Sequence, residues 1–503
     1  MKKQLAIAIT VALASGSVYA AGTNIGYTVD SDIETAIATQ YGNDLESKAG
    51  DRAVVKASDA SDGNSVSLTQ DSGNVSGDSH LSVVELVNSD NNKVTVYQQG
   101  SSNASAVVLK GNGNKTSNKN VVTVKQFSSN NDSVVHLNGA DENVNVSVTQ
   151  RASDNDSIVN LKKADGNYII VDQNTNNKST IEATGVNAPH GTRSDVGNRI
   201  TVKQQGSGST SEFMGLESGG NTIAVTQATG DYSNIDMIDS SDNTNVSVKQ
   251  SGTGVGNEAT IYMNGADSNL KVAITQNSNI NRAGVALINS DSNRDISITQ
   301  GQNNDAGILL HESDNNKVTI VQKQNNKFNA PGWDGAGVGL SYSSNNNLSV
   351  NQGENNAALV GAFESNNNTI ALTQTSNNDA AILLEHSGSE GTGNGNSVIV
   401  KQNDSNYALV HVSSSDGNVV TLDQSFGNTA FVDVLNESDY NKIDIDQFGS
   451  NALATVHLSG SAMNVGDNAL AGTKGIYIRQ SDNDFANVSL TNSNANAIQI
   501  VQK

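Results

Sequence analysis

The fold is decided by one recurring stretch, Asn92-Lys93-Val94-Thr95-Val96-Tyr97-Gln98-Gln99-Gly100-Ser101-Ser102-Asn103. Val94 and Val96 alternate with polar residues and lead into Gln98, which is the period of two of a β-strand with one buried face. Gly100 and Asn103, in the polar stretch that follows, accept the positive φ that a tight reversal needs. The stretch therefore predicts a strand that ends in a turn.

The Gln at the end of this strand recurs along the chain, most often at spacings of 22 to 24 residues. Val, Ile or Leu stands two and four residues before every copy, and Asn stands six residues before 13 of the 18 copies. A fixed period of this length is typical of solenoids, whose repeats stack on one another. The recurring residues are Gln70, Gln98, Gln126, Gln150, Gln173, Gln204, Gln227, Gln250, Gln276, Gln300, Gln322, Gln352, Gln374, Gln402, Gln424, Gln447, Gln480 and Gln502.

A second alternating segment follows each turn, with a small, a β-branched and an aliphatic residue on one face, as in Ala306, Ile308 and Leu310. Each repeat then reads as strand, arc, strand, arc. We predict an all-β fold, a β-solenoid of about 18 such rungs that form two stacked parallel sheets. Equivalent residues would lie about 4.8 Å apart along the axis. The Gln side chains would then form a structural ladder, because a buried amide is tolerated only where it finds hydrogen-bond partners.

The two ends of the chain differ from the repeats. Residues 1–20 combine Lys2 and Lys3, a short apolar run and a small-residue cleavage pattern, which predicts a signal peptide and an exported protein. Residues 21–60 are irregular and predict a degenerate rung, a cap or a disordered segment before the repeat solenoid of residues 61–503. At the other end, Ile498 and Ile500 belong to half a rung and predict an open C-terminal edge.

Composition excludes several classes of function. The formal net charge of −22 argues against nucleic acid as a partner, because phosphate binding requires a basic surface. The chain has no Cys, so its stability must come from packing and hydrogen bonds. The seven His show no metal-binding spacing, and no pair among the 51 acidic residues interrupts the repeat. We expect no catalytic residue, no cofactor, no metal site and no integral membrane segment.

The repeat resembles the curlin repeat of bacterial curli fibre subunits. Asn64 to Gln70 and Asn92 to Ala104 match its pattern of a polar residue, a strand ending in Gln, a Gly-containing loop, Asn and a small residue. Two features differ, since the leading Ser of the family is usually Asn here and the Gln that closes the second strand is replaced by aliphatic residues. Those aliphatic residues include Leu109, Leu137, Leu161, Leu287, Leu310 and Leu384.

The resemblance implies an amyloid-like subunit of a biofilm fibre, secreted to the extracellular space or cell surface of a bacterium. The implied partners are the protein itself, other curli-type subunits, a nucleator and an outer-membrane export pore. Two other hypotheses remain at this point. The first is a monomeric solenoid adhesin or matrix protein that binds surfaces or glycans through its side loops, and the second is a solenoid enzyme acting on polysaccharide.

Overall fold

The computed structural model describes the regions that carry the repeats, and every structural statement below refers to these ranges alone. They are residues 53–57, 63–71, 82–87, 91–101, 103–111, 120–127, 129, 131–139, 145–162, 167–184, 198–216, 222–239, 245–251, 256–265, 271–290, 295–326, 336–386, 396–414, 418–435, 442–460, 475–492 and 497–502. The chain forms two compact units, an N-terminal unit of Ala21–Leu270 and a C-terminal unit of Lys271–Lys503. Each is described separately.

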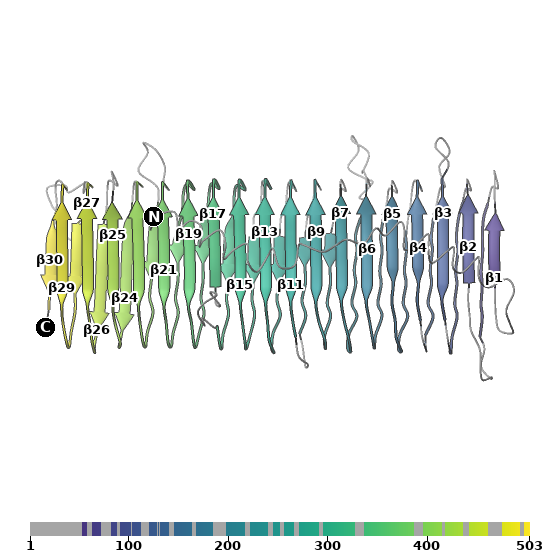
Figure 1. Ribbon diagram of the computed structural model, residues 1–503, viewed down its shortest axis with the longest axis horizontal. Coiled ribbons are helices and arrows are strands. Elements are labelled where there is room, and N and C mark those ends of the chain that lie inside the picture. The colour runs from purple at the N-terminus through teal and green to yellow at the C-terminus, as the bar shows by residue number, and fades with distance from the viewer. Residues whose placement is uncertain are drawn as a thin grey trace, which may run out of the picture. The chain divides into compact units, whose positions relative to one another are not determined.

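Every regular element in the described ranges is a β-strand (Figure 1). The strands that lead into a Gln form one sheet of each unit, here called the Gln sheet, and the strands that follow the turn form the second sheet. In the N-terminal unit the second sheet contains β1 (Ala53–Ala57), β2 (Ser82–Val87), β3 (Ser105–Lys110), β4 (Val134–Asn138), β5 (Ile158–Lys162), β6 (Ser179–Thr184), β7 (Ser211–Leu216), β9 (Ser233–Ile238) and β11 (Ala259–Asn264). Its Gln sheet contains β8 (Thr222–Ala224) and β10 (Asn245–Ser247).

The C-terminal unit repeats this arrangement with longer ladders in both sheets. Its second sheet contains β13 (Ala283–Ile288), β15 (Ala306–His311), β17 (Ala336–Ser341), β19 (Ala358–Phe363), β21 (Ala380–Glu385), β23 (Ala408–Ser413), β25 (Ala430–Leu435), β27 (Ala454–Ser459) and β29 (Ala486–Thr491). Its Gln sheet contains β12 (Lys271–Ile274), β14 (Asp295–Ile298), β16 (Lys317–Ile320), β18 (Asn347–Ser349), β20 (Ile370–Ala371), β22 (Ser397–Val400), β24 (Val419–Ser425), β26 (Lys442–Phe448), β28 (Gly475–Arg479) and β30 (Ile498–Val501).

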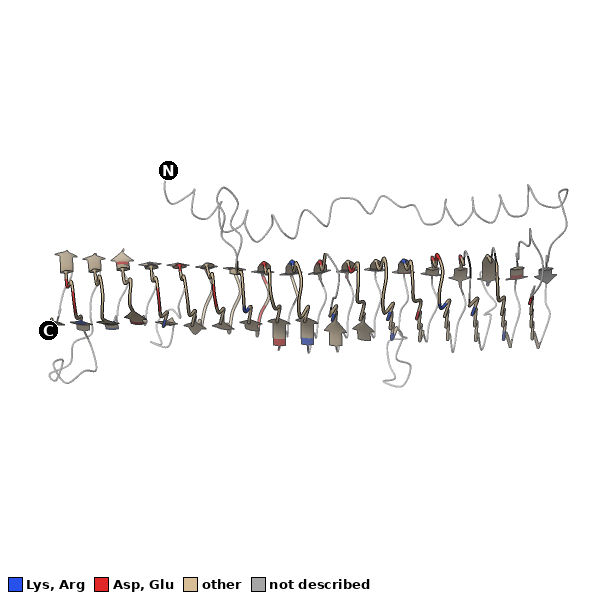
Figure 2. Ribbon diagram, turned by 90° about the horizontal axis from the view of Figure 1, so that it is seen from below, with Lys and Arg blue, Asp and Glu red and all other residues tan. Residues whose placement is uncertain are grey.

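Neighbouring strands in each sheet are parallel, and their register aligns equivalent repeat positions. β15 pairs with β17 so that Ala306 lies beside Ala336 and Leu310 beside Leu340. Within each unit the two sheets face each other (Figure 2), and arcs connect them at both ends of the strands (Figure 1). The predicted all-β parallel solenoid with two stacked sheets is therefore confirmed.

The predicted number of eighteen two-stranded rungs is not confirmed. The second sheets contain nine strands in each unit, whereas the Gln sheets contain two described strands in the N-terminal unit and ten in the C-terminal unit. The early segments that lead into a Gln are nevertheless joined to the next rung by backbone hydrogen bonds. Leu68 donates to the carbonyl of Thr95 at 3.0 Å, and Val96 donates to that of Thr123 at 3.0 Å.

The aliphatic positions before each Gln form the core of the solenoid. Of the 36 such positions in the chain, all are buried except those of the first and last repeats, Val66, Leu68, Ile498 and Ile500. The facing positions of the second sheet are buried as well, as in Ile308 and Leu310 at 0% exposure. Burial of repeated aliphatic side chains between two sheets supplies the main favourable contribution to folding.

Among the described residues, the one directly after a strand of the second sheet usually has a positive φ. The sequence predicts Gly and Asn at reversals, and Gly265 (φ 63°) fits this expectation, yet Glu312 (φ 48°), Tyr342 (φ 52°) and His386 (φ 50°) adopt the same conformation. A non-glycine residue in this region carries a conformational cost. The next rung compensates for it, because the N–H of Glu312 donates to the carbonyl of Ser341 at 2.9 Å.

The ladder extends into the segment of residues 21–60. β1 belongs to this segment and pairs in parallel with β2 so that Ala53 lies beside Ser82. The predicted signal peptide and the degenerate rung around Gln40 lie outside the described residues. Within the described part of the chain, no helix of the length and hydropathy needed to cross a membrane is found.

Candidate functional site

The most regular polar feature of both units is a ladder of Gln side chains. Gln70 to Gln480 are buried in the described repeats, with at most 7% exposure, whereas Gln502 is exposed. In each pair of successive rungs, the Nε2 of one Gln donates to the Oε1 of the next. In the N-terminal unit these bonds link Gln70, Gln98, Gln126, Gln150, Gln173, Gln204, Gln227 and Gln250. In the C-terminal unit they link Gln276, Gln300, Gln322, Gln352, Gln374, Gln402, Gln424, Gln447 and Gln480.

Twelve of the buried Gln also donate a hydrogen bond to a backbone carbonyl in the arc of their own rung. The second N–H of Gln374 donates to the carbonyl of Asp379 at 2.8 Å, and that of Gln402 donates to the carbonyl of Tyr407 at 2.9 Å. Both acceptors stand directly before a strand of the second sheet. One amide therefore closes the turn between the two sheets and joins its rung to the next, and both of its hydrogens are satisfied. This double role favours Gln at the position.

Two Asn columns accompany the Gln ladder. One stands before the strand that leads into the Gln, as in Asn396, which donates to Asn368 at 2.6 Å. The other lies in the arc after the Gln, as in Asn378, which donates to Asn356 at 2.6 Å. These Asn donate towards the preceding rung, while the Gln donate towards the following one. The side-chain dipoles of the Asn columns therefore point in the opposite direction to those of the Gln column.

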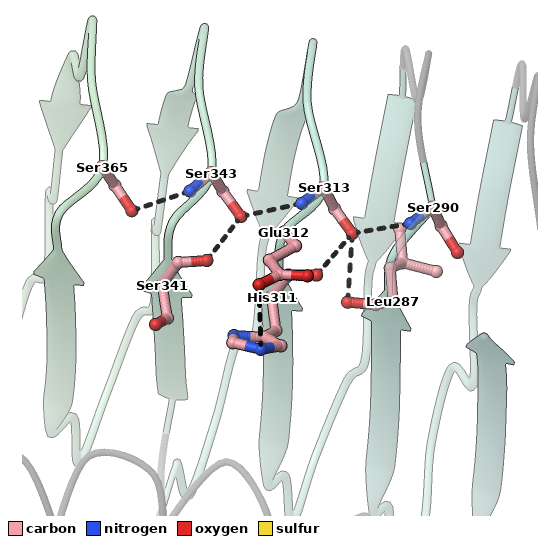
Figure 3. Close-up of polar contacts among 8 residues, drawn as sticks. All are labelled: Leu287, Ser290, His311, Glu312, Ser313, Ser341, Ser343 and Ser365. Atoms are coloured by element: carbon pink, nitrogen blue, oxygen red, sulfur yellow. Dashed lines mark hydrogen bonds and ion pairs between the residues drawn. The ribbon is translucent and has the colours of Figure 1, made fainter. Parts of the chain in front are cut away.

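A column of buried Ser lies in the arc that follows each strand of the second sheet, and the repeat pattern did not predict it. The N–H of Ser313 donates to the Oγ of Ser343 at 3.1 Å, and the N–H of Ser343 donates to the Oγ of Ser365 at 3.2 Å (Figure 3). Each hydroxyl in turn donates to a carbonyl at the end of its own strand, as Ser365 does to Phe363 at 2.9 Å. The signal was present in the sequence as a Ser two residues after the second strand.

One position in the arc Asn column carries a carboxylate instead. Asp231 is 2% exposed, its Oδ1 accepts from Asn257 at 2.6 Å, and its Oδ2 is buried without a partner. Burial raises the pKa of Asp231 to about 6. A further carboxyl at the arc, that of Asp132, has its pKa raised to about 6 by burial and by the charge of Asp156. Mild acidification therefore neutralises both carboxyls, of which Asp231 is buried and Asp132 is exposed.

A short row of histidines lies on the outer face of the second sheet. The Nδ1 of His411 lies 3.8 Å from one oxygen of Asp433, and the Nδ1 of His457 lies 3.6 Å from the other. The nearby imidazole of His411 is the main reason that the pKa of Asp433 is lowered. No cluster of three or more side chains suited to hold a metal ion occurs among the described residues.

The core opens to solvent at the C-terminal edge of the described strands. Ile498 and Ile500 are 40% and 42% exposed, whereas their register partners Ile476 and Ile478 on β28 are buried. Leu490 on β29 is 37% exposed, whereas its register partner Leu458 on β27 is buried. The Nε2 of Gln480 is buried and has no hydrogen-bond partner. Since every earlier Gln of the C-terminal unit donates to the next Gln, this orphan donor marks the point at which the ladder stops.

Comparison with known proteins identifies one family. Residues 90–117 match the family model described as curlin associated repeat. The comparisons with curated proteins and with solved structures give no match. The matched residues include the strand, Gln98 and the turn on which the resemblance was based. The chain therefore carries a curlin associated repeat, as its sequence pattern predicts.

Proposed function

We propose that this chain is a structural, extracellular protein of bacteria, a curli-like fibre subunit that assembles by end-to-end stacking of solenoids. In this proposal it is exported to the cell surface or biofilm matrix, acts with other curli-type subunits, a nucleator and an export pore, and has no catalytic role. The curlin associated repeat and the parallel, in-register strands support this assignment. The same stacking that joins rungs within the chain can then join one chain to another.

The observation that carries the proposal is the open C-terminal edge. Among the described strands β29 pairs with β27 alone and β30 with β28 alone, so both present unpaired backbone groups. Exposed Leu490, Ile498 and Ile500 line the same end. An edge that combines free backbone donors and acceptors with apolar side chains favours addition of further strands. Contact between two different ends of identical molecules does not close, and filaments result.

The test is assembly of the purified protein and of one pair of variants. We expect fibres in electron micrographs, Thioflavin T fluorescence with a concentration-dependent lag, and a meridional reflection near 4.8 Å. Ile498→Asp with Ile500→Asp places two charges in the seam and should abolish elongation. The matched control, Asn487→Asp with Gln499→Asp, adds the same charges at exposed positions of β29 and β30 and should still elongate. Protein that stays monodisperse at high concentration would contradict the proposal.

A row of exposed rings gives specific support to one second candidate, a monomeric adhesin. His311, Tyr342, Phe363 and His386 lie on successive rungs with ring centroids 5.8, 5.7 and 6.1 Å apart. Tyr342 is 47% exposed, and a row of partly exposed aromatic rings is a surface on which an apolar sugar face or another protein could pack. Binding of purified monomer to glycan-coated beads, lost on Tyr342→Ala, would favour this candidate.

A further inference from the structure

The outer face of the second sheet has no acidic residue, Lys or Arg at its central positions over six neighbouring strands of the C-terminal unit. β13, β15, β17, β19, β21 and β23 each direct their second and fourth residues away from the core, and these positions hold only Gly, Ala, Leu and one His. The described elements form only the two facing sheets, so none of them packs on this outer face. Leu309, Leu383 and Leu409 on it are partly exposed.

The equivalent positions of the N-terminal unit include four acidic residues, Glu85, Glu182, Glu212 and Asp236. The whole chain has a formal net charge of −22, so two copies repel each other over most of their surfaces. Like charges set face to face across an interface oppose association. The uncharged face of the C-terminal unit is therefore a surface on which two copies can meet without opposing acidic residues.

Glycines make part of this face flat. Gly284, Gly307 and Gly337 lie side by side in register on β13, β15 and β17. A Cβ added to Gly337 would meet no atom nearer than 3.9 Å, so the packing of the fold does not require Gly there. Gly inside a strand costs stability, and it often marks a place where another backbone approaches closely. The glycines thus favour an approach from outside the sheet.

The same column of outward residues becomes bulky in the next three strands, where Leu359, Ala381 and Leu409 continue it in register. A two-fold axis that runs parallel to the strands between β17 and β19 would set this column against its own copy in reverse order. Each Gly then faces a larger residue, and in the neighbouring column Leu309 faces Leu383. The pairs of the first column are Gly284 with Leu409, Gly307 with Ala381 and Gly337 with Leu359.

We propose that two copies of the chain pair through this outer face, about a two-fold axis between β17 and β19. The contact is isologous, because the same six strands supply both sides, and it closes with one partner for each face. The inference rests on the proposed fibre in one respect, since stacked subunits would present the face repeatedly and two fibres would pair side by side. The facing sheets would lie about 10 Å apart, as in other sheet-on-sheet packings.

The area of the face sets how strong one such contact is. Six strands about 4.8 Å apart, each contributing about five residues of 3.3 Å, cover roughly 500 Å² on each copy. The total of about 1,000 Å² lies at the lower limit for a specific protein interface. One pair of faces is therefore weak, whereas successive faces along two fibres act together and hold the fibres in pairs.

A charge swap on the full-length chain tests both the face and its register. The first variant carries Leu309→Lys with Leu383→Glu, and the matched control carries Leu309→Lys with Leu383→Lys. Within one chain the two positions are three strands apart, about 14 Å, so the new charges interact strongly only across the proposed pair. Opposite charges face each other twice in the first variant, and like charges do so in the control.

Electron micrographs should show paired fibres for the wild type and the Lys/Glu variant, and single fibres for the Lys/Lys control. All three proteins should elongate, because the face lies away from the ends of the stack. Single wild-type fibres, or equal pairing in the two variants, would overturn the paired face and leave the fibre proposal standing. Single fibres throughout, with the urea midpoint lowered in both variants, would show that the same chain covers the face and would also overturn the pairing.

Sedimentation of the soluble proteins separates the two proposals if no fibres form. Absence of fibres overturns the proposed function, and the mass of the soluble protein then tests the face by itself. At high concentration, dimers of the wild type and the Lys/Glu variant with monomers of the Lys/Lys control would uphold the pairing. Monomers of all three proteins would overturn it.

Discussion

Replacing Asp231 by Asn should stabilise the N-terminal unit at neutral pH. Asp231 occupies a column that is Asn in most other arcs, such as Asn155 and Asn177. Its Oδ1 already accepts from Asn257, but its Oδ2 is buried and has no donor to satisfy it. An Asn at this position keeps the acceptor, adds two N–H donors towards the preceding rung and carries no charge.

The magnitude follows from the pKa of Asp231, which burial raises from 3.8 to about 6. A shift of about two units corresponds to about 3 kcal/mol, and solvent screening around the arc reduces this to roughly 1–3 kcal/mol. The folded state therefore binds its proton more tightly than the unfolded state. The ionised carboxylate of Asp231 therefore destabilises the folded state; this destabilisation is absent below pH 4, grows between pH 4 and 6, and is complete above pH 6. Asp231→Asn removes the destabilisation because the amide carries no charge.

Urea unfolding followed by far-UV circular dichroism at pH 4 and pH 7.5 measures this effect. We expect the variant to raise the urea midpoint at pH 7.5 with an unchanged slope, and the difference from wild type to shrink at pH 4. Asp239→Asn is the matched control, since Asp239 is exposed and its removal deletes one charge as well. A gain of the same size at both pH values, or a loss of stability at pH 7.5, would refute the reasoning.

Three further predictions concern the columns and the charge. Five buried Ser hydroxyls of the N-terminal unit have no hydrogen-bond partner, and the C-terminal unit has Ala at the equivalent positions, as in Ala306 and Ala380. Replacing one of these Ser by Ala should therefore raise the free energy of unfolding, measured with urea, by about 1 kcal/mol per site. The sites are Ser105, Ser133, Ser157, Ser179 and Ser233. Gln374→Ala should cost about 3–5 kcal/mol, because the donor on Gln352 and the acceptors on Gln402 and Asp379 all lose their partner, whereas Gln502→Ala at the exposed end should change the midpoint little. Fibre elongation, followed by Thioflavin T, should accelerate when pH falls from 7.5 to 5.5 or when salt is added, because both weaken repulsion between acidic chains; slower growth would contradict this.

The sequence was sufficient to predict the sheets because each rung repeats the same inward positions. Alternation before Gln402, for example, assigns Val398 and Val400 to the buried face, and both are fully or almost fully buried. Register needs no further information, because a shift by one residue would move every aliphatic side chain of a strand to solvent. The curlin resemblance rests on the same positions, and residues 90–117 bear it out.

Other features depend on neighbours in space and were not predictable from one repeat. The Ser column was not predicted because Ser is common throughout the arcs. Only the structure shows that Ser313 and Ser343 are both fully buried and hydrogen-bonded to each other. The positive φ of Glu312 contradicts residue preference, and the hydrogen bond to Ser341 in the next rung is what permits it. The predicted number of rungs is not confirmed for a related reason, since most of the early Gln-leading segments are hydrogen-bonded to the next rung without forming regular strands.

The open end bears on whether a chain this long needs a partner at all. Adding rungs increases the number of satisfied Gln donors, but it leaves the number of chain ends unchanged, so one Gln such as Gln480 always remains without its acceptor. The exposed area of Ile498 and Ile500 is likewise set by the last rung and not by chain length. The free energy gained when two molecules stack therefore depends on their ends alone, whereas the free energy of unfolding increases with every rung. A long solenoid should resist unfolding far better than a short one and yet add to a fibre with the same driving force, which favours the fibre subunit over the monomeric adhesin.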